Sequence, residues 1–244
     1  MLHILFSPSE AKRLTCKGRK LSELLFGLEK REKILKTYNA VALSNDIETK
    51  QKLFGLKREE DIARFSFDIF DTFTCKAIEL YVGVAYEYLD FASLPSDARR
   101  HISKRTLIFS NLYGSVRADD DIAPYKVKQG ERIGDIASER FYKEHFSEQL
   151  DDYLQNGEIL DLRAGYYDKF YKVRAPYTTM KFYKNGKVVS HYAKAYRGLV
   201  LRAIAQSKID SIDALSQLPI EGLHVKDIKT IKQKREIAYD IIAP

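Results

Sequence analysis

A turn signal followed by a cationic helix start constrains this chain more than any other feature. Asn185-Gly186 lies between the β-prone pairs Phe182-Tyr183 and Val188-Val189. Asn-Gly tolerates positive φ at both central positions of a type I′ turn, so the sequence predicts a β-hairpin. Lys194 and Arg197 follow three residues apart, which places both on one face of the helix expected there. Such a face can hold an anion.

The rest of the chain alternates short apolar runs with amphipathic stretches, which is typical of an α+β domain. Strands are expected at residues 2–6, 106–109, 158–162 and 236–242. Helical spacing of apolar residues favours helices over 21–35, 78–89, 141–154 and 211–218. Ser7-Pro8-Ser9-Glu10 has the capping-box pattern that starts a helix. The sequence shows no internal repeat or linker, so we expect one domain over residues 1–244.

Composition favours a cytoplasmic protein. The 244 residues are 45% hydrophobic, which is enough for a sizeable core. Apolar runs such as Leu2–Phe6 are far shorter than the roughly 18 residues of a membrane span, and the first residues lack the pattern of a secretory signal. Cys16 and Cys75 lie in neither a C-x-x-C pair nor a metal-ligand spacing. We therefore expect two isolated, reduced thiols in a reducing compartment, and no membrane partner.

The charge balance favours polyanionic partners. The formal net charge is +7, with 41 Lys and Arg against 34 Asp and Glu. Much of this charge lies in mixed runs such as residues 30–33 and 57–61, which are typical of solvated helix faces. Phosphate-binding loops, dinucleotide fingerprints and nucleophile elbows are absent from the sequence. The five histidines form no i, i+4 pair and have no cysteine nearby in sequence, so we predict neither a metal nor a cofactor.

Four segments place polar and charged residues in a characteristic order. They are residues 8–12 (Pro-Ser-Glu-Ala-Lys), 111–126 (with Leu-Tyr-Gly-Ser-Val-Arg and Asp-Ile-Ala-Pro-Tyr-Lys), 161–167 (Asp-Leu-Arg-Ala-Gly-Tyr-Tyr) and 190–198 (Ser-His-Tyr-Ala-Lys-Ala-Tyr-Arg-Gly). Together they resemble the motifs of the YaaA family of bacterial peroxide-stress proteins. Ala11, Ala118 and Lys126 stand where that family usually has Gly, Pro and Arg.

The resemblance implies both a fold and a role. The fold would be a single mixed-sheet α+β domain with surrounding helices and a basic cleft, which is called the cantaloupe fold in this family. The role would be a response to hydrogen peroxide that includes DNA binding without sequence specificity and limits oxidative, iron-dependent damage.

Polar residues of the four segments are the candidate site. We interpret Glu10 and His191 as acid–base groups, since an ordinary histidine pKa of about 6.5 suits proton transfer. The candidate DNA or anion ligands carry a cation, a hydroxyl or an aromatic ring: Ser9, Lys12, Tyr113, Arg117, Lys126, Arg163, Tyr167, Lys194 and Arg197. Structural alternatives remain open for several of them. Glu10 can belong to a helix cap, His191 can be structural, and Arg117 and Arg163 can form internal ion pairs with aspartates.

Two functions are compatible with these residues. In the first, a basic cleft neutralises DNA phosphates while tyrosines stack on unpaired or distorted bases. The tyrosines considered are Tyr113, Tyr125, Tyr167 and Tyr192. In the second, an enzyme binds a nucleotide or another small anion in the same cleft. A groove as wide as a duplex favours the first function, and a closed pocket of roughly 300–1,000 Å³ favours the second. The resemblance favours DNA binding.

Overall fold

A mixed eight-stranded sheet organises the protein, as a computed structural model that describes residues 1–189 and 192–242 shows. Its strands are β1 (Leu2–Phe6), β3 (Thr106–Ser110), β4 (Gly114–Arg117), β6 (Glu158–Asp161), β7 (Tyr177–Lys184), β8 (Lys187–Val188), β9 (Leu223–Ile231) and β10 (Lys234–Ile241). The strand order is β4-β3-β1-β6-β7-β10-β9, and β8 pairs with β7. A second, two-stranded sheet pairs β2 (Cys75–Lys76) with β5 (Asp121–Ile122). The expected α+β class with a mixed sheet is confirmed.

The centre of the large sheet is parallel. Strands β3, β1, β6, β7 and β10 are parallel to one another, whereas β4, β8 and β9 pair antiparallel with β3, β7 and β10. Every residue of β1 is buried, as expected for a parallel strand that is covered on both faces. From β1 the chain proceeds to β3 on one side, and from the adjacent β6 it proceeds to β7 on the other. The carboxyl ends of β1 and β6 therefore form a topological switch point, where α/β sheets open a crevice for ligands.

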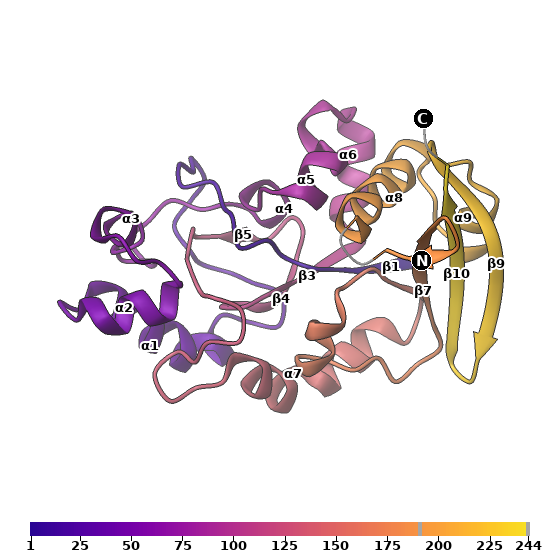
Figure 1. Ribbon diagram of the computed structural model, residues 1–244. Coiled ribbons are helices and arrows are strands. Elements are labelled where there is room, and N and C mark those ends of the chain that lie inside the picture. The colour runs from indigo at the N-terminus through magenta and orange to yellow at the C-terminus, as the bar shows by residue number, and fades with distance from the viewer. Residues whose placement is uncertain (190–191, 243–244) are drawn as a thin grey trace.

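Helices cover both faces of this sheet. The α-helices are α1 (Glu32–Leu43), α2 (Ile47–Phe54), α3 (Glu59–Ala63), α4 (Ala77–Leu80), α5 (Val84–Leu89), α6 (Ser96–Ser103), α7 (Ser138–Leu154), α8 (Ala193–Ser207) and α9 (Ile212–Gln217). Short 3-10 turns occupy Glu29–Arg31, Phe91–Ser93 and Gly165–Lys169. In Figure 1, α5, α6 and α8 lie on one side of β1 and β3, α7 lies on the other, and α1–α3 gather far from β9 and β10. No helix within 1–189 or 192–242 is long and apolar enough to cross a membrane.

Several sequence predictions are confirmed. Asn185 and Gly186 have φ of 52° and 76° and join β7 to β8 in the expected hairpin. The helix that carries Lys194 and Arg197 is α8, and the expected strands at 2–6, 106–109, 158–162 and 236–242 correspond to β1, β3, β6 and β10. The expected helices over 141–154 and 211–218 correspond to α7 and α9.

Other local predictions were wrong because contacts across the fold override local patterns. The expected helix over 78–89 is split into α4 and α5 at Gly83, whose φ is 113°. Residues 21–28 are not helical, and α1 begins only at Glu32. Ser7 starts no helix, since its Oγ accepts a hydrogen bond from the Ala164 N–H at 2.8 Å. A side chain expected to cap a helix instead joins two loops.

The prediction of two isolated thiols was also wrong. Cys16 and Cys75 are joined by a disulfide, with their Cα atoms 5.1 Å apart. Residues 11–20 and 73–82 run antiparallel beside each other, as the isolated bridges Lys12–Tyr81 and Lys20–Phe73 indicate. The two cysteines are 59 residues apart in sequence, and no spacing rule indicates that the fold brings such distant positions together.

Candidate functional site

A pocket of about 480 Å³ opens at the carboxyl ends of β1 and β6. Its lining comes from the loop after β1, the start of α5, the segment after β6 and the first turns of α8: Phe6, Ser7, Pro8, Ser9, Glu10, Ala11, Val84, Ala85, Tyr86, Gln129, Leu162, Ala164, Tyr167, Lys194 and Arg197. This is the switch point of the sheet, where the crevice is expected from topology alone.

Hydrogen bonds to Ser7 connect three walls of the pocket. Its Oγ accepts the Ala164 N–H at 2.8 Å, and its carbonyl oxygen accepts the Tyr86 hydroxyl at 2.9 Å. Gly83, which precedes α5, has φ of 113°, and a Cβ built there would lie 2.8 Å from the Ser9 Oγ. A glycine is therefore required at this position both by conformation and by the close approach of the loop.

Helix α8 supplies the cations of the pocket. At Gly198 a Cβ would lie 2.1 Å from the Ala85 carbonyl oxygen, so the helix backbone packs directly against α5. Arg197 and Lys194 precede this contact, and both line the pocket. Arg197 is half-buried, and its side chain has no hydrogen-bond or ion-pair partner in the part of the chain that the structure describes. Burial lowers the pKa of Arg197, and the charge of Asp161 opposes that change.

A second group of charges lies at the rim. The Glu10 carboxylate is 3.4 Å from the Lys126 Nζ and accepts the Gln129 N–H at 3.3 Å. Lys12 donates to the carbonyl oxygens of Ser9 and Glu10 at 3.0 and 3.3 Å. Its ammonium is 4.1 Å from the centre of the Tyr125 ring. Lys12 therefore stabilises the backbone at residues 9 and 10 through hydrogen bonds and does not line the pocket.

The environment of Lys12 disfavours its charged form. Burial, together with the positive charge of Lys126, lowers the pKa of Lys12 to about 7, while Glu10 acts in the opposite direction. The Tyr125 ring beneath it is buried, and the Tyr125 hydroxyl is hydrogen-bonded to those of Ser110 and Tyr81. Tyr125 therefore belongs to the core and is not placed to stack on a base.

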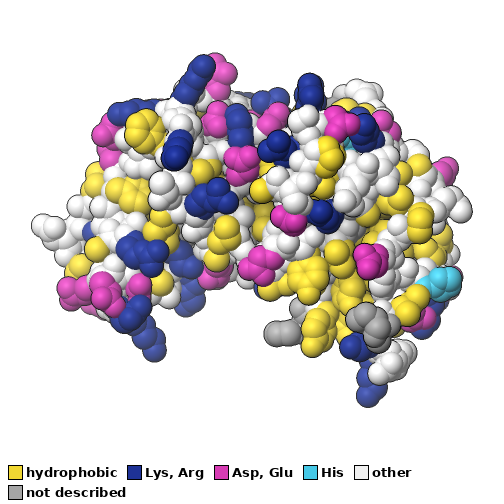
Figure 2. Space-filling model, turned by 90° about the horizontal axis from the view of Figure 1, so that it is seen from above, with side chains coloured by type: hydrophobic (Ala, Val, Ile, Leu, Met, Phe, Trp, Pro, Cys, Tyr) yellow, Lys and Arg dark blue, Asp and Glu magenta, His cyan; other side chains and the backbone are white. Residues whose placement is uncertain are grey.

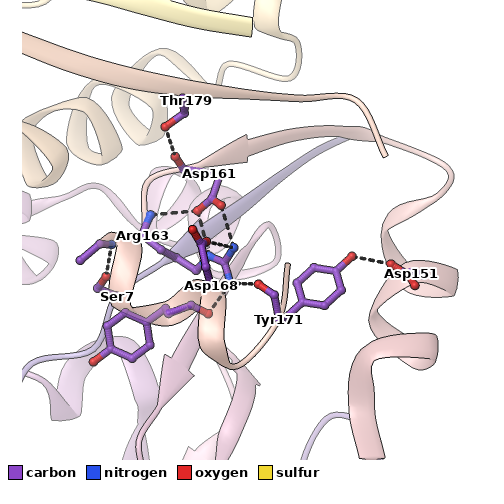
Figure 3. A network of polar contacts seen from close by, with 9 residues as sticks. Ser7, Asp151, Asp161, Arg163, Asp168, Tyr171 and Thr179 are labelled. Carbon is purple, nitrogen blue, oxygen red and sulfur yellow. Dashed lines mark hydrogen bonds and ion pairs between the residues drawn. The ribbon is translucent and has the colours of Figure 1, made fainter. Parts of the chain in front are cut away.

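Arg163 lies behind the pocket in an internal network (Figure 3). Its guanidinium forms a bidentate pair with Asp161 at 2.7 and 2.9 Å and packs over the Phe109 ring at 4.4 Å. The remaining amine, Nη1, donates to the carbonyl oxygens of Tyr171 and Tyr167 at 2.9 and 3.2 Å. Groups of the protein thus occupy its donors, and the geometry corresponds to the structural alternative in which Arg163 pairs with an aspartate.

Two further candidates lie away from the pocket. Tyr113 is fully buried, and its hydroxyl donates to the Ala123 carbonyl oxygen at 3.2 Å. Arg117 extends from the end of β4 and pairs with Asp120 and Asp119 at 3.1 and 3.4 Å. Neither residue is part of the pocket lining.

The structure therefore brings together only some of the candidates. Those that line the pocket are Ser9, Glu10, Tyr167, Lys194 and Arg197. Lys12 and Lys126 contact the rim through Glu10, whereas Tyr113, Arg117 and Arg163 do not line the pocket. His191 lies outside the described residues. Within those residues, no three His, Cys, Asp or Glu side chains are grouped closely enough to hold a metal ion.

Sequence reasoning missed the wall formed by Val84, Ala85 and Tyr86. A signal was present, because Gly83 interrupts an otherwise helical pattern and an isolated glycine of this kind marks a close approach or a break. Gln129 was also missed, and nothing in the local sequence distinguishes it from a surface loop residue.

A second, shallower hollow of about 300 Å³ lies beside α6. It is lined by Arg99, Arg100 and Lys104, whose side chains have no ion-pair partner among residues 1–189 and 192–242, and by Lys76 and Glu79 among others. Figure 2 shows Lys and Arg side chains interspersed with Asp and Glu on the face that it presents.

The fold and the site together define a mixed-sheet α+β protein with a partly enclosed, cation-bearing pocket at a topological switch point. The chain belongs to the YaaA family, since residues 2–229 match the family model described as peroxide stress protein YaaA.

Three relatives match between 62% and 99% of this chain. An uncharacterized protein of Campylobacter jejuni is 46% identical over 246 residues, which cover 99% of this chain and 100% of the relative. A UPF0246 protein of Streptomyces coelicolor is 29% identical over 82% of each chain. A UPF0246 protein of Neisseria meningitidis is also 29% identical, over 62% of this chain and 64% of its own.

Proposed function

We propose that the protein serves the peroxide-stress response by binding a small organic anion of nucleotide size in the pocket at the ends of β1 and β6. One observation carries the proposal: Arg197 is half-buried in the wall of a pocket of about 480 Å³ and has no partner among the described residues. An arginine placed in this way binds a phosphate or carboxylate through two parallel hydrogen bonds. The volume lies within the roughly 300–1,000 Å³ that is usual for small-molecule sites.

The other walls match the rest of such a ligand. Phe6, Pro8, Val84 and Leu162 provide apolar surface for an uncharged body, and Lys194 lies at the lip as a second cation. Glu10 is the ionisable carboxyl group at the rim. We assign to Glu10 the role of acid–base group in any reaction of the bound anion.

Binding of AMP and of inorganic phosphate, measured by calorimetry and by the shift in melting temperature, tests the proposal. Replacing Arg197 by Ala should weaken AMP binding by about tenfold or more, because a charge-assisted bidentate contact is lost. Lys194→Ala should weaken it by a smaller factor, since Lys194 is exposed. The matched control is Lys57→Ala, which removes an exposed cation of the α2–α3 loop and should have no effect. Equal affinities in wild type and Arg197→Ala would refute the proposal.

DNA binding is the second candidate function, and the hollow beside α6 is the observation that favours it. Arg99, Arg100 and Lys104 present three cations without ion-pair partners in the described part of the chain, on a protein of net charge +7. Contacts of this kind neutralise phosphates of duplex or distorted DNA irrespective of sequence. In this candidate role, the bound DNA would be protected from oxidative, iron-dependent damage inside the cell.

Salt dependence separates the two possible DNA surfaces. Each phosphate contact contributes about −0.9 to the slope of log K against log salt, so three cations should give a slope near −3 on duplex DNA. Arg99→Ala or Arg100→Ala should each reduce that slope by about one if the α6 hollow is the contact surface. Lys194→Ala and Arg197→Ala should do so if DNA enters the cleft itself. No binding of duplex, bulged or single-stranded DNA at about 50 mM salt would exclude this function.

A further inference from the structure

We propose that Cys16 and Cys75 are a peroxide-oxidisable pair whose disulfide holds two walls of the pocket together. The consequence for ligand binding rests on the proposed anion pocket, whereas the redox chemistry and its effect on the backbone do not.

The pair lies on the two segments that lead into the pocket. Residues 11–20 and 73–82 run side by side, with Gly18 N–H bonded to the Thr74 carbonyl oxygen on one side of the disulfide. On the other side, the Arg13 N–H donates to the Leu80 carbonyl oxygen and the Val82 N–H donates to that of Ala11, each within 3.1 Å. Immediately beyond these bonds the first segment becomes the wall at residues 9–11 and the second becomes the wall at residues 84–86.

Apart from the disulfide, hydrogen bonds join these segments near the cysteines, including those from the Thr74 N–H and hydroxyl to the Arg19 carbonyl oxygen at 2.9 and 2.6 Å. The loop from residue 7 to residue 28 contains no helix, and most of its residues from 10 to 20 are exposed or half-buried. The disulfide is the covalent connection between this loop and β2. Its loss leaves hydrogen bonds as the connections between the two segments, and a largely exposed loop without helix that is held in this way opens more readily than one with a covalent link.

The surroundings of the pair suit a reaction with peroxide. Cys75 is partly exposed, whereas Cys16 is buried beside it. Lys17 and Lys76 follow the two cysteines directly in sequence, and the Lys76 ammonium is paired with Asp121 at 2.9 Å. The thiolate is the form that reacts with peroxide, and the partial exposure of Cys75 gives the oxidant access to it. A disulfide in a reducing cytoplasm is usually transient and redox-sensing, which fits the cytoplasmic location that the sequence favours.

The chemistry balances with hydrogen peroxide as the oxidant. The Cys75 thiolate attacks one peroxide oxygen, the O–O bond breaks, and hydroxide leaves to give a sulfenic acid. The Cys16 thiolate then attacks that sulfur, the S–O bond breaks, and a second hydroxide leaves. Overall, two thiols and one peroxide give one disulfide and two waters, so the sulfur pair loses the two electrons that the peroxide gains.

The test uses the full chain, reduced and freed of reductant, and then titrated with hydrogen peroxide. Thiol labelling with a maleimide polymer should show the loss of both thiols together at about one equivalent of peroxide. Trypsin reports on the loop, because Lys12, Arg13, Lys17, Arg19 and Lys20 are all cleavage sites. We expect cleavage in this loop to be about fivefold or more faster in the reduced protein, because the open loop is the state that is cut.

Two variants fix the interpretation. Cys16→Ser/Cys75→Ser should be cut at the fast rate in both the presence and the absence of peroxide. Cys75→Ser alone should form no intramolecular disulfide. Calorimetry then measures the affinity of the pocket for AMP. The oxidised wild type should bind AMP severalfold more tightly than the reduced form. Failure of the disulfide to form, or equal trypsin rates in the two redox states, would overturn the inference. Different trypsin rates with no AMP binding in either state would instead overturn the anion pocket and leave the redox pair standing.

Discussion

Arg163 and Arg197 lie near the same carboxylate, but their surroundings differ. Arg163 follows β6 in sequence and forms a bidentate pair with Asp161, and two backbone carbonyl oxygens accept its Nη1 hydrogens. Arg197 lies on α8 and lines the pocket. Asp161 forms no hydrogen bond or ion pair with it in the described part of the chain, but the negative charge of Asp161 acts to raise the pKa of Arg197. One guanidinium is saturated by the protein, whereas the other retains its hydrogen-bonding capacity.

This difference separates an arginine whose donors are used within the fold from one whose donors are available to a ligand. A buried cation with every donor satisfied stabilises the fold around it and has nothing left for a ligand. A cation that is desolvated by a pocket wall and lacks a partner gains most when an anion arrives. Sequence motifs do not make the distinction, because both arginines lie within the same set of family segments.

Replacing Arg163 by Met should have the largest effect. The change leaves the Asp161 carboxylate buried without its partner, which typically costs about 3–5 kcal/mol of unfolding free energy. Urea denaturation followed by circular dichroism measures this loss. The double variant Asp161→Asn/Arg163→Met should recover part of it, since the unpaired charge is then absent. A loss below about 1 kcal/mol for Arg163→Met would contradict the structural role and would break the comparison with Arg197.

Lys12 should make stability depend on pH. Its pKa falls from its ordinary value to about 7 in the folded protein, so between about pH 7 and 10.5 the unfolded chain binds more protons. Below pH 7 Lys12 is charged in both the folded and the unfolded protein, and the cost of burying its ammonium lowers the unfolding free energy by the full amount. This loss of stability disappears as the pH rises from about 7 to 10.5. Lys12→Met removes the titrating group. The unfolding free energy of the wild type should therefore rise relative to Lys12→Met from pH 7 to 9.5, by an amount on the order of 3 kcal/mol.

The pH window is limited by the buried tyrosines. Burial raises the pKa of Tyr125 to about 12, which gives the opposite slope at high pH because the folded protein then retains the proton. Measurements that stop at pH 9.5 avoid this contribution. A difference between wild type and Lys12→Met that does not change with pH would show that the Lys12 ammonium remains hydrated.

The sequence predicted features that depend on neighbouring residues. The Asn185-Gly186 hairpin and the helix after it follow from local turn chemistry and from apolar spacing. Features that depend on contacts between residues far apart in the sequence could not be predicted from it. Arg31 lies in a mixed-charge run that is typical of a solvated helix, yet it is fully buried and donates to the carbonyl oxygens of Tyr113 and Ser115. Those partners are more than 80 residues away.

The same limit applies to the site. Lys194 and Arg197 were recognisable from their spacing on one helix, whereas the wall at residues 84–86 becomes part of the pocket only through the packing of α5 against α8. Cys16 and Cys75 illustrate the point most directly, because their pairing depends on two segments that meet only in the folded chain.

Gly198→Ala should have an intermediate effect. The added Cβ would lie 2.1 Å from the Ala85 carbonyl oxygen, so α8 must move away from α5. Overpacking of this kind costs about 1–3 kcal/mol of unfolding free energy. The displacement also moves Arg197 relative to the opposite wall, and AMP affinity should fall even though no ligand contact is removed. Ala203→Gly, farther along α8, is the control for altered helix propensity. Unchanged AMP affinity in Gly198→Ala would show that the packing of α8 against α5 does not affect ligand binding in the pocket.

Arg197→Ala should have the smallest effect on stability, and this result sharpens the comparison most. Its side chain forms no hydrogen bond or ion pair within the described ranges, and its burial disfavours the charge, so removal should change the unfolding free energy by less than about 1 kcal/mol in either direction. Loss of the packed side-chain methylenes and relief of the desolvated charge act in opposite directions. The same urea experiment as for Arg163→Met measures the change, with Lys57→Ala as the exposed control. A loss as large as that of Arg163→Met would mean that Arg197 is also a structural residue. A small loss combined with weakened AMP binding would identify Arg197 as the cation that the fold keeps free for the ligand.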